Sequence, residues 1–327
     1  MKKKILLRRL AGLVSLILCA SLLLCFANEI FVDKGHYRDL KRVLYTDDEN
    51  SYPLLFVGGS HMGGAINPPY FKKEFGINSF NASTGGQELY ETYYLLKEIL
   101  KRQNPKVVVL DIYYALNQSP YGDKSFAHRV LDPMKISCNK IKAIEASVPA
   151  KDRLAYFFPL LMYHSRWSDT KSIQKEWQDY IGKYTGALGF DAGDQQYGKK
   201  MAYDNWNYAA CTPLADKQEN YLQKFFQLAQ DENFQLVLIN FPCEMSSDKL
   251  TQWAGDAPGK LNQIKQEASA VGIPFLDLNR PNQMEKMGFD FPTMMNNASH
   301  VNYDGAYVVT EYVGKYLQQN TPELFAD

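Results

Sequence analysis

Short apolar runs alternate with amphipathic stretches along most of the chain. The runs cover residues 54–57 (LLFV), 106–112 (KVVVLDI), 235–240 (QLVLIN) and, more weakly, 273–278 (IPFLDL). Apolar runs of this length that end in a turn are typical of buried parallel strands. Helical spacing of apolar residues follows at 88–102, 221–231, 260–271 and 306–317. The alternation predicts a three-layer α/β fold with a central, mostly parallel, flavodoxin-like sheet, in a domain over residues 51–320.

Residues from about 115 to 215 interrupt this alternation. The stretch is rich in aromatic residues and contains no clear strand run. We expect an insertion or a lid over the sheet. The sequence shows no internal repeat and no linker that would separate a second domain.

The N-terminal segment differs from the rest of the chain. Residues 10–28 contain no charge and are mostly apolar, which is about the length that a helix needs to cross a bilayer. Cations precede this stretch at Lys2, Lys3, Lys4, Arg8 and Arg9. The positive-inside rule then predicts a cytoplasmic tail at 1–9, a signal anchor at 10–28, a juxtamembrane linker at 29–50 and an extracytoplasmic domain. The alternative is a cleaved signal peptide that releases a secreted protein.

Composition narrows the possible partners and cofactors. With 46% hydrophobic and 22% charged residues, the 327-residue chain is globular. Basic and acidic residues both number 36, but the basic N-terminal cluster leaves the remainder net acidic, so nucleic-acid binding is not expected. Cys138, Cys211 and Cys243 are too scattered for a disulfide framework or a zinc site, although one pair could bridge. We expect no cofactor and no metal, because the chain lacks the clustered ligands and glycine-rich phosphate loops that bind them.

The first apolar run leads directly into a candidate nucleophile. Ser60 stands in the sequence GGSHMGG at 58–64, at the carboxyl end of the predicted strand, where open parallel sheets bind ligands. The alternative is that Ser60 only caps the next helix. A serine nucleophile needs a base, and among five histidines His300 is the best candidate, because it lies in the loop before the last helix. His36 and His128 are expected to be solvated surface residues.

Four segments together resemble the SGNH/GDSL hydrolase superfamily. They are FVGGSHMGGAINP at 56–68, FNASTGGQELYETYYLLKEIL at 80–100, YHSRW at 163–167 and NNASHVNYDGA at 296–306. They are similar in particular to its membrane-anchored bacterial branch, which includes the DltD protein of teichoic-acid D-alanylation and the alginate acetylation proteins. The resemblance spans about residues 50–318.

The resemblance implies roles for several residues. Ser60 would be the nucleophile and His300 the general base, with the backbone N–H groups of Ser60 and of Gly85 or Gly86 holding the oxyanion. Two positions depart from the family pattern. Asn297 stands where the family usually has aspartate; its amide oxygen could still orient the imidazole but could not stabilise the imidazolium by charge. Asp290 or Asp304 is an alternative source of a carboxylate. The third family block is absent, which leaves Asn117 as a loose candidate for the missing oxyanion donor.

The YHSRW segment has two interpretations. In the first, His164, Arg166 and Trp167 bind substrate, with the guanidinium pairing a phosphate or uronate and the indole stacking on a sugar. In the second, Trp167 and Tyr163 are packing anchors of the insertion and Arg166 forms an internal salt bridge.

The sequence therefore predicts a membrane-anchored, extracytoplasmic, SGNH-like serine esterase or O-acyltransferase that acts on a cell-envelope polysaccharide or teichoic-acid-like polymer. A polytopic membrane-bound O-acyltransferase is an expected partner. The alternative is a catalytically idle SGNH-like scaffold, or a glycan-binding partner of such an acyltransferase, which Asn297 favours. A solute-binding protein has less support, because nothing in the sequence indicates two matched lobes.

Overall fold

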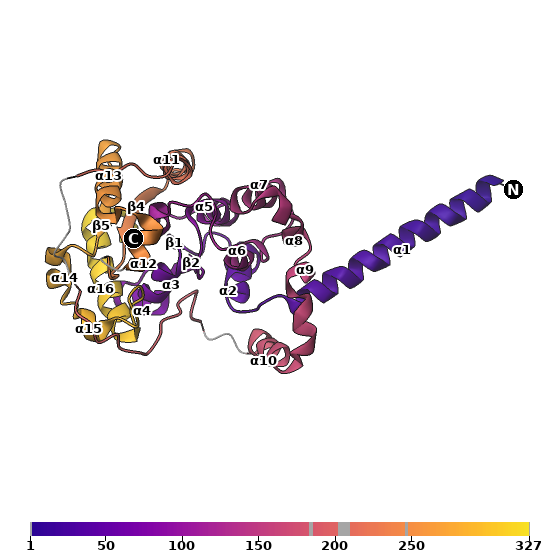
Figure 1. Ribbon diagram of the computed structural model, residues 1–327, viewed down its shortest axis with the longest axis horizontal. Coiled ribbons are helices and arrows are strands. Elements are labelled where there is room, and N and C mark those ends of the chain that lie inside the picture. The colour runs from indigo at the N-terminus through magenta and orange to yellow at the C-terminus, as the bar shows by residue number, and fades with distance from the viewer. Residues whose placement is uncertain (1, 183–185, 202–209, 246–247, 327) are drawn as a thin grey trace.

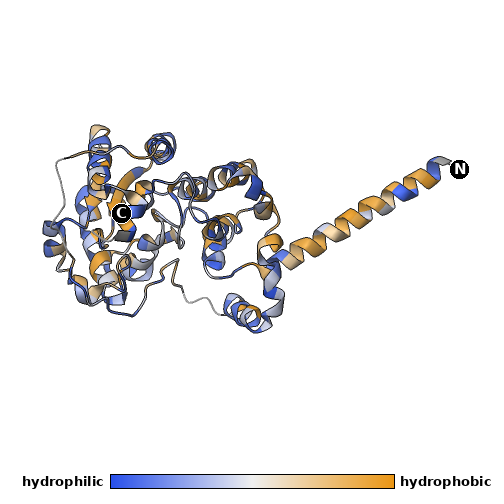
Figure 2. Cartoon of the chain, viewed as in Figure 1, coloured by the Kyte–Doolittle hydropathy of each residue, from blue (hydrophilic) through white to orange (hydrophobic). Residues whose placement is uncertain are grey.

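The computed structural model describes residues 2–182, 186–201, 210–245 and 248–326. It consists of an α/β body from which one long helix, α1 (Lys2–Phe31), projects (Figure 1). Figure 2 shows that hydrophobic residues cover most of the length of this helix. The fold therefore divides into a packed body and a single protruding segment.

Five strands form one parallel sheet within the described residues. They are β1 (Leu54–Gly58), β2 (Ser79–Ser83), β3 (Val107–Asp111), β4 (Gln235–Asn240) and β5 (Phe275–Asp277). Their order is β2-β1-β3-β4-β5, and each neighbouring pair is parallel. This is the flavodoxin-like order of doubly wound sheets, in which the strand order reverses beside β1. The predicted α/β fold with a central parallel sheet is confirmed.

The helices that pack around the sheet are mostly short. On the N-terminal half they are α2 (Tyr37–Lys41), η1 (Arg42–Thr46), α3 (Ser60–Ala65), α4 (Pro68–Phe75), α5 (Leu89–Ile99), η2 (Tyr113–Leu116), α6 (Lys124–Leu131) and α7 (Cys138–Ser147). The segment that follows contains η3 (Ala150–Asp152), α8 (Leu154–Phe157), α9 (Leu160–Tyr163), η4 (His164–Ser168) and α10 (Thr170–Ile181). The C-terminal half contains α11 (Asp216–Asp231), α12 (Asp248–Ala254), α13 (Ala257–Ala270), α14 (Pro281–Met287), α15 (Phe291–Met294), α16 (Tyr303–Asn320) and η5 (Pro322–Leu324).

Alternate residues of each strand face two separate hydrophobic cores. Leu55 and Val57 of β1 pack with residues of α5, α7, α11 and α13, whereas Leu54 and Phe56 pack with residues of α3, α4 and α16. All four side chains are fully buried. Burial on both faces explains why the strands read as continuous apolar runs, and it establishes the three layers.

Strand β2 has no counterpart in the predicted elements, and its sequence explains why. In SFNAS only Phe80 and Ala82 are apolar, and they enter one core. The buried polar side chain of Asn81 faces the other way and donates to the carbonyl oxygens of Met62 and Ile66 in and after α3, at 2.9 and 3.0 Å. Edge strand β2 therefore uses an amide, in place of an apolar residue, to hold α3 against the sheet.

The beginning of the chain is joined to the body by a folded segment. Helix α1 is long and apolar enough to cross a membrane, a property that a signal sequence shares. The stretch expected as a linker at 29–50 contains α2 and η1, and Leu40, Val43 and Leu44 of these helices are buried in the same core as α5. The α/β body therefore includes residues that lie well before β1.

The aromatic-rich stretch at 115–215 divides into parts with different surroundings. Helices α6 and α7 pack on α5 and complete one layer, while α8, α9 and η4 lead to the base of α1 (Figure 1). Residues 186–193 cross α3, with Leu188 O accepting from Asn81 N and Asp191 N donating to Gly63 O, both at 3.0 Å. Four aromatic residues of the stretch lie outside the described residues: Tyr184, Tyr203, Trp206 and Tyr208.

Candidate active site

The turn from β1 into α3 places Ser60 at the carboxyl edge of the sheet. Two glycines before Ser60 allow other elements to come close. A Cβ on Gly58 would lie 2.4 Å from the Asp111 Cβ, and one on Gly59 would lie 2.3 Å from the Tyr114 ring. Any larger residue at either position would push the turn away from β3. The glycine pair therefore fixes Ser60 as the first residue of α3.

Ser60, His300 and Asn297 form a continuous hydrogen-bonded relay. The Ser60 Oγ lies 2.7 Å from His300 Nε2, and His300 Nδ1 lies 3.1 Å from Asn297 Oδ1. Because an amide oxygen only accepts, it selects the imidazole tautomer that carries its proton on Nδ1. That tautomer leaves Nε2 free to accept the proton of the serine hydroxyl. The structure thus brings together three residues that the sequence analysis selected, two of which are 240 positions apart.

Asn297 also shapes the loop that carries His300. Its Oδ1 accepts from the backbone N–H groups of Ser299 and His300, at 2.9 and 3.1 Å. The Asn296 N–H donates back to His300 O at 2.8 Å, which closes the turn. An Asx turn of this kind needs a short side chain with an acceptor oxygen, which asparagine and aspartate both supply. Asn297 therefore positions the imidazole through the backbone as well as through Nδ1.

His61 contributes a buried ring beneath this relay. It stacks on His300 with ring centroids 4.8 Å apart and contacts Tyr113 at 3.8 Å. Its ring nitrogens have no hydrogen-bond partner among the described residues. Burial, reinforced by the neighbouring His300, holds the pKa of His61 well below its usual value. Burial likewise lowers the pKa of His300. Both rings are therefore neutral at pH 7, as a general base at His300 requires.

Asp111, the last residue of β3, and Tyr114 of η2 lie beside the nucleophile. The Tyr113 N–H donates to Asp111 Oδ1 at 3.0 Å. Burial raises the pKa of the Asp111 carboxyl to about 7, against the opposing effect of backbone hydrogen bonds from Tyr113, Gly59 and Met62. The Tyr114 hydroxyl forms a side-chain hydrogen bond with Ser60. These residues were not selected from the sequence, although their position directly after a predicted strand is a signal that could have identified them.

The oxyanion candidates separate into two groups. Gly85 lines a cavity of about 360 Å³ together with Ser60 and His300. Gly86 and Asn117 line a different pocket, and Asn117 Nδ2 donates to Glu88 Oε1 at 2.9 Å. The backbone of Gly85 therefore shares a cavity with the serine, whereas the Asn117 amide is bonded to a carboxyl group elsewhere.

Arg129 brings a guanidinium to the 360 Å³ cavity that Ser60 lines. Arg129 of α6 and His36 both line it, and the Arg129 Nη1 donates to Gly85 O at 3.4 Å. A Cβ on Gly85 would lie 2.2 Å from that Nη1, so glycine makes room for the guanidinium. Asp191 lines the same cavity and raises the pKa of His36, whereas burial, the larger effect, lowers it.

Two histidines occupy positions that the sequence analysis assigned wrongly. His36 is not a solvated surface residue, because it lies partly buried in the wall of the Ser60 cavity. His128 is buried and its Nδ1 lies 2.9 Å from Asp132 Oδ1, while its ring stacks on Tyr156. The polar neighbours of His128 in sequence suggested a loop, but the residue lies on the inner face of α6.

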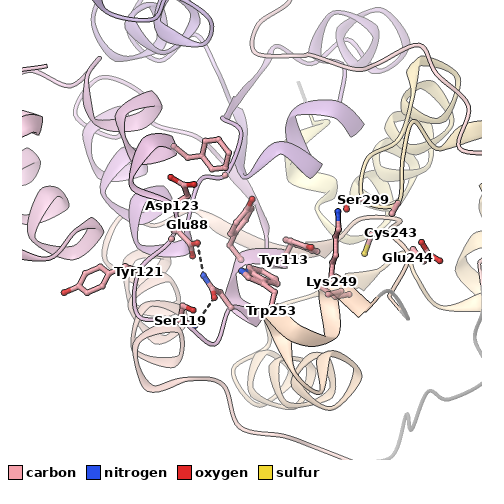
Figure 3. Close-up of a pocket in the computed structure, with 17 residues that line it drawn as sticks. Glu88, Tyr113, Ser119, Tyr121, Asp123, Cys243, Glu244, Lys249, Trp253 and Ser299 are labelled. Atoms are coloured by element: carbon pink, nitrogen blue, oxygen red, sulfur yellow. Dashed lines mark hydrogen bonds between the residues drawn. The ribbon is translucent and has the colours of Figure 1, made fainter. Parts of the chain in front are cut away.

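A second pocket, of about 450 Å³, is lined in part by Ala298 and Ser299 of the loop before His300 (Figure 3). Its aromatic lining includes Tyr113 and Trp253, which stack with centroids 4.9 Å apart and an interplanar angle of 16°. Glu88, Lys249 and Ser299 add polar groups. Because Ser299 precedes His300 and Tyr113 contacts His61, this pocket and the Ser60 cavity flank the same histidine loop.

The structure places the YHSRW segment away from both cavities. Arg166 forms an ion pair with Glu176 and donates to Phe31 O at 2.7 Å, at the base of α1. His164 Nδ1 lies 2.9 Å from Leu161 O, and the Trp167 side chain is largely exposed. The structure does not bring these three residues to Ser60. The internal salt bridge of the second interpretation is present, but Trp167 is not a buried anchor.

The remaining polar candidates have other surroundings. Asp290 precedes α15 and accepts from Thr293 Oγ1, and Asp304 lies in the first turn of α16. All five cysteines are free. In the part of the chain that the structure describes, no group of His, Cys, Asp and Glu side chains could hold a metal ion.

Comparison with known proteins gives only distant likenesses. No protein-family model and no curated protein matches the sequence. Similar solved structures include an acetyl xylan esterase, with 15% identity, a TM-score of 0.41, and coverage of 81% of this chain and 98% of that chain. A GDSL-like lipase from Bacteroides thetaiotaomicron has 12% identity and a TM-score of 0.40, covering 81% and 87%. The lipase/acylhydrolase from Enterococcus faecalis has 11% identity and a TM-score of 0.36, covering 81% and 95%. Likenesses at these TM-scores do not assign the chain to a family.

Proposed function

We propose that this protein is an SGNH-like serine esterase or O-acyltransferase of the cell envelope, related to the membrane-anchored branch that includes DltD. The observation that carries the proposal is the relay from Ser60 Oγ through His300 to Asn297 Oδ1, with contacts of 2.7 and 3.1 Å. Nucleophile, base and orienting group in this arrangement are the parts that acyl transfer through serine needs. Helix α1 would anchor the catalytic domain to the outer face of the membrane.

The proposed reaction has two steps, acylation of Ser60 and then transfer of the acyl group from Ser60. His300 Nε2 accepts the proton of Ser60 as Oγ attacks the ester carbonyl, and the backbone N–H groups of Ser60 and Gly85 stabilise the oxyanion. Protonated His300 then gives the proton to the departing alkoxide, leaving an acyl group on Ser60. Water or a sugar hydroxyl next gives a proton to His300 and attacks the acyl group, and collapse of the intermediate returns the proton to Ser60.

The two cavities support a polymeric, charged substrate. The stacked Tyr113 and Trp253, with polar groups around them, offer a sugar an aromatic face and hydrogen-bonding partners (Figure 3). Arg129 places a guanidinium in the Ser60 cavity, where it can pair a carboxylate or a phosphate. A cell-envelope polysaccharide or a teichoic-acid-like polymer provides both a sugar for the aromatic pocket and an anionic group for Arg129. Its ester would lie between these two groups, at Ser60.

Covalent labelling tests the nucleophile directly. The full-length protein is treated with a fluorophosphonate probe, and the modified peptide is identified by mass spectrometry. We expect labelling at Ser60, loss of labelling in Ser60→Ala, and strong slowing in His300→Ala. Thermal unfolding of each variant confirms that it is folded. A folded wild-type protein that does not react at Ser60 and turns over no ester would contradict the proposal.

A second candidate function rests on Asn297. An amide orients the imidazole but supplies no negative charge to stabilise the imidazolium, so the site has less driving force than one with a carboxylate. This feature favours a catalytically idle scaffold that binds a glycan or a membrane-bound O-acyltransferase. Replacing Asn297 by aspartate distinguishes the two functions, as described in the Discussion.

A further inference from the structure

Exposed apolar side chains gather on the short helices at the base of α1. Between 40% and 71% of each residue is exposed. Exposed apolar residues that gather in one segment, unlike scattered single ones, mark an interaction surface. They belong to α8, α9, η4 and the turn between α8 and α9. We call them the basal patch: Leu154, Phe158, Leu161, Met162 and Trp167.

The basal patch meets α1 where its apolar stretch ends. The Leu160 N–H donates to Asn28 Oδ1 at 2.8 Å, and Asn28 is the last residue of the uncharged stretch 10–28. Arg166 Nη1 donates to Phe31 O at 2.7 Å, three residues further along. Figure 1 shows α9 directly beside this end of α1. The patch therefore has a defined level along the helix axis.

That level coincides with the surface of a bilayer. The apolar residues 10–27 extend about 27 Å at a rise of about 1.5 Å per residue, close to the ~30 Å hydrocarbon thickness. If α1 crosses the membrane along this stretch, Asn28 and Phe31 lie among the lipid headgroups. The basal patch, which contacts α1 at these residues, lies at the same depth.

Polar contacts hold the patch segment and the end of α1 together. Trp177 Nε1 of α10 donates to Ile30 O at 3.3 Å. The Lys34 ammonium lies 4.8 Å from the Trp177 ring centroid and 5.8 Å from that of Tyr180. Arg38 donates to Asp179 O and Gly182 O, both at 2.8 Å. Helix α10 and the residue after it therefore contact the chain at Ile30, near the end of α1, and at Arg38, after α1 has ended. The basal patch precedes α10 directly, so it cannot turn away from α1 without breaking several of these contacts.

We propose that the basal patch rests in the membrane interface, as a second, non-spanning contact of this protein with the bilayer. A tryptophan among exposed aliphatic side chains suits the headgroup boundary, where the indole ring buries its apolar surface and keeps its N–H near water. The proposal rests on membrane anchoring by α1. It goes further by adding an interfacial contact that fixes how the catalytic body is oriented.

Depth-dependent quenching of tryptophan fluorescence tests the proposal. The full-length protein is reconstituted into phosphatidylcholine vesicles whose acyl chains carry bromine near the headgroup or near the chain end. We expect quenching by the shallow bromines, with loss of much of this signal in Trp167→Phe. The matched control is Trp253→Phe, because Trp253 lines the pocket beside the active site. It should leave the quenched component unchanged.

Charge substitutions then test whether the patch itself makes the contact. Leu161→Glu is expected to reduce the quenching of Trp167 fluorescence. The matched control is Val271→Glu, at the end of α13 in the body, which should leave this quenching unchanged. Leu161 and Val271 are similarly exposed, at 53% and 50%. Vesicle flotation, measured on the same samples, reports anchoring by α1 separately.

Each alternative outcome is decisive. Protein that floats with vesicles but shows no Trp167-dependent quenching keeps the anchor and overturns the basal patch as a lipid contact, leaving that face for a protein partner. Protein that does not float overturns both the anchor and the patch. Fluorophosphonate labelling of Ser60 on the same samples shows whether the catalytic proposal survives in either case.

Discussion

The site around Ser60 and the helical segment before α10 each contain a histidine with polar neighbours, yet their construction differs. The His300 ring is half-buried, and both of its nitrogens contact a side-chain oxygen. The His164 ring is exposed, and its Nδ1 faces a carbonyl of its own helical turn. The comparison shows that the tautomer and orientation of His300 are set by side chains from two separate chain segments, whereas His164 contacts only its own helical turn.

Exchanging the two histidines for alanine gives the largest expected contrast. His300→Ala removes the base of the proposed relay, so kcat for an activated ester should fall by about 10⁴-fold or more. His164→Ala should leave kcat within about twofold, because His164 contacts neither cavity. Steady-state kinetics and thermal unfolding of both variants check this. Equal losses of activity in folded proteins would end the distinction between the two regions.

The pH profile tests the state of the His300 base. Burial lowers the pKa of His300, so the neutral, active ring persists to a pH below its usual value. The value of kcat/KM should therefore be constant near neutral pH and fall about tenfold per pH unit once the pH drops below that lowered pKa. A profile of kcat/KM against pH, with unfolding followed in parallel, measures this limb. A limb located above pH 7 would contradict a neutral base.

Asn297→Asp sharpens the role of the orienting group. A carboxylate beside Nδ1 stabilises the imidazolium, so we expect kcat to rise about tenfold, as a charge-assisted hydrogen bond allows. The same charge raises the pKa of His300, and the acid limb of kcat/KM moves to higher pH. Both changes are read from one set of pH-dependent rates. Absence of ester turnover in both the folded wild-type protein and folded Asn297→Asp would instead favour the idle scaffold.

Arg129→Met tests the guanidinium that lines the Ser60 cavity. With a pair of esters that differ only in a distal carboxylate, loss of the guanidinium should lower kcat/KM for the anionic ester about tenfold and change the neutral one much less. Arg129→Lys should retain part of the preference. If kcat/KM falls by the same factor for the anionic and the neutral ester, Arg129 serves only to position the Gly85 loop.

The smallest effect is expected at the base of α1. Arg166→Met removes the partly exposed ion pair with Glu176, which contributes less than about 1 kcal/mol. It also removes the hydrogen bond to Phe31 O. We expect faster limited proteolysis of the segment at 154–181 and unchanged ester turnover. A clear fall in kcat/KM for a glycan ester would instead support the first interpretation of the YHSRW segment, in which it binds substrate.

Sheet topology explains what the sequence could predict. Apolar runs locate the strands, and parallel strands place their carboxyl ends at one edge, so the position of Ser60 follows from a general rule. His300 was selected by its place in the loop before the last helix and by the family resemblance. No such rule fixes the position of YHSRW, which depends on contacts with α1 that are 135 positions away in sequence. Strand β2 was missed because Asn81 replaces an apolar core residue by an amide. Arg129 and His36 enter the site from helical segments whose packing no periodicity reveals.

Because His36 lies in the wall of the Ser60 cavity, its place in the chain limits the distance between the proposed catalytic centre and the membrane surface. His36 follows Phe31, the last residue of α1, by only five positions. A chain of that length spans at most about 18 Å even when fully extended. If α1 is embedded as proposed, His36 lies within about 18 Å of Phe31, and Ser60 lines the same cavity as His36. A substrate of the proposed kind would then have to present its ester close to the membrane surface.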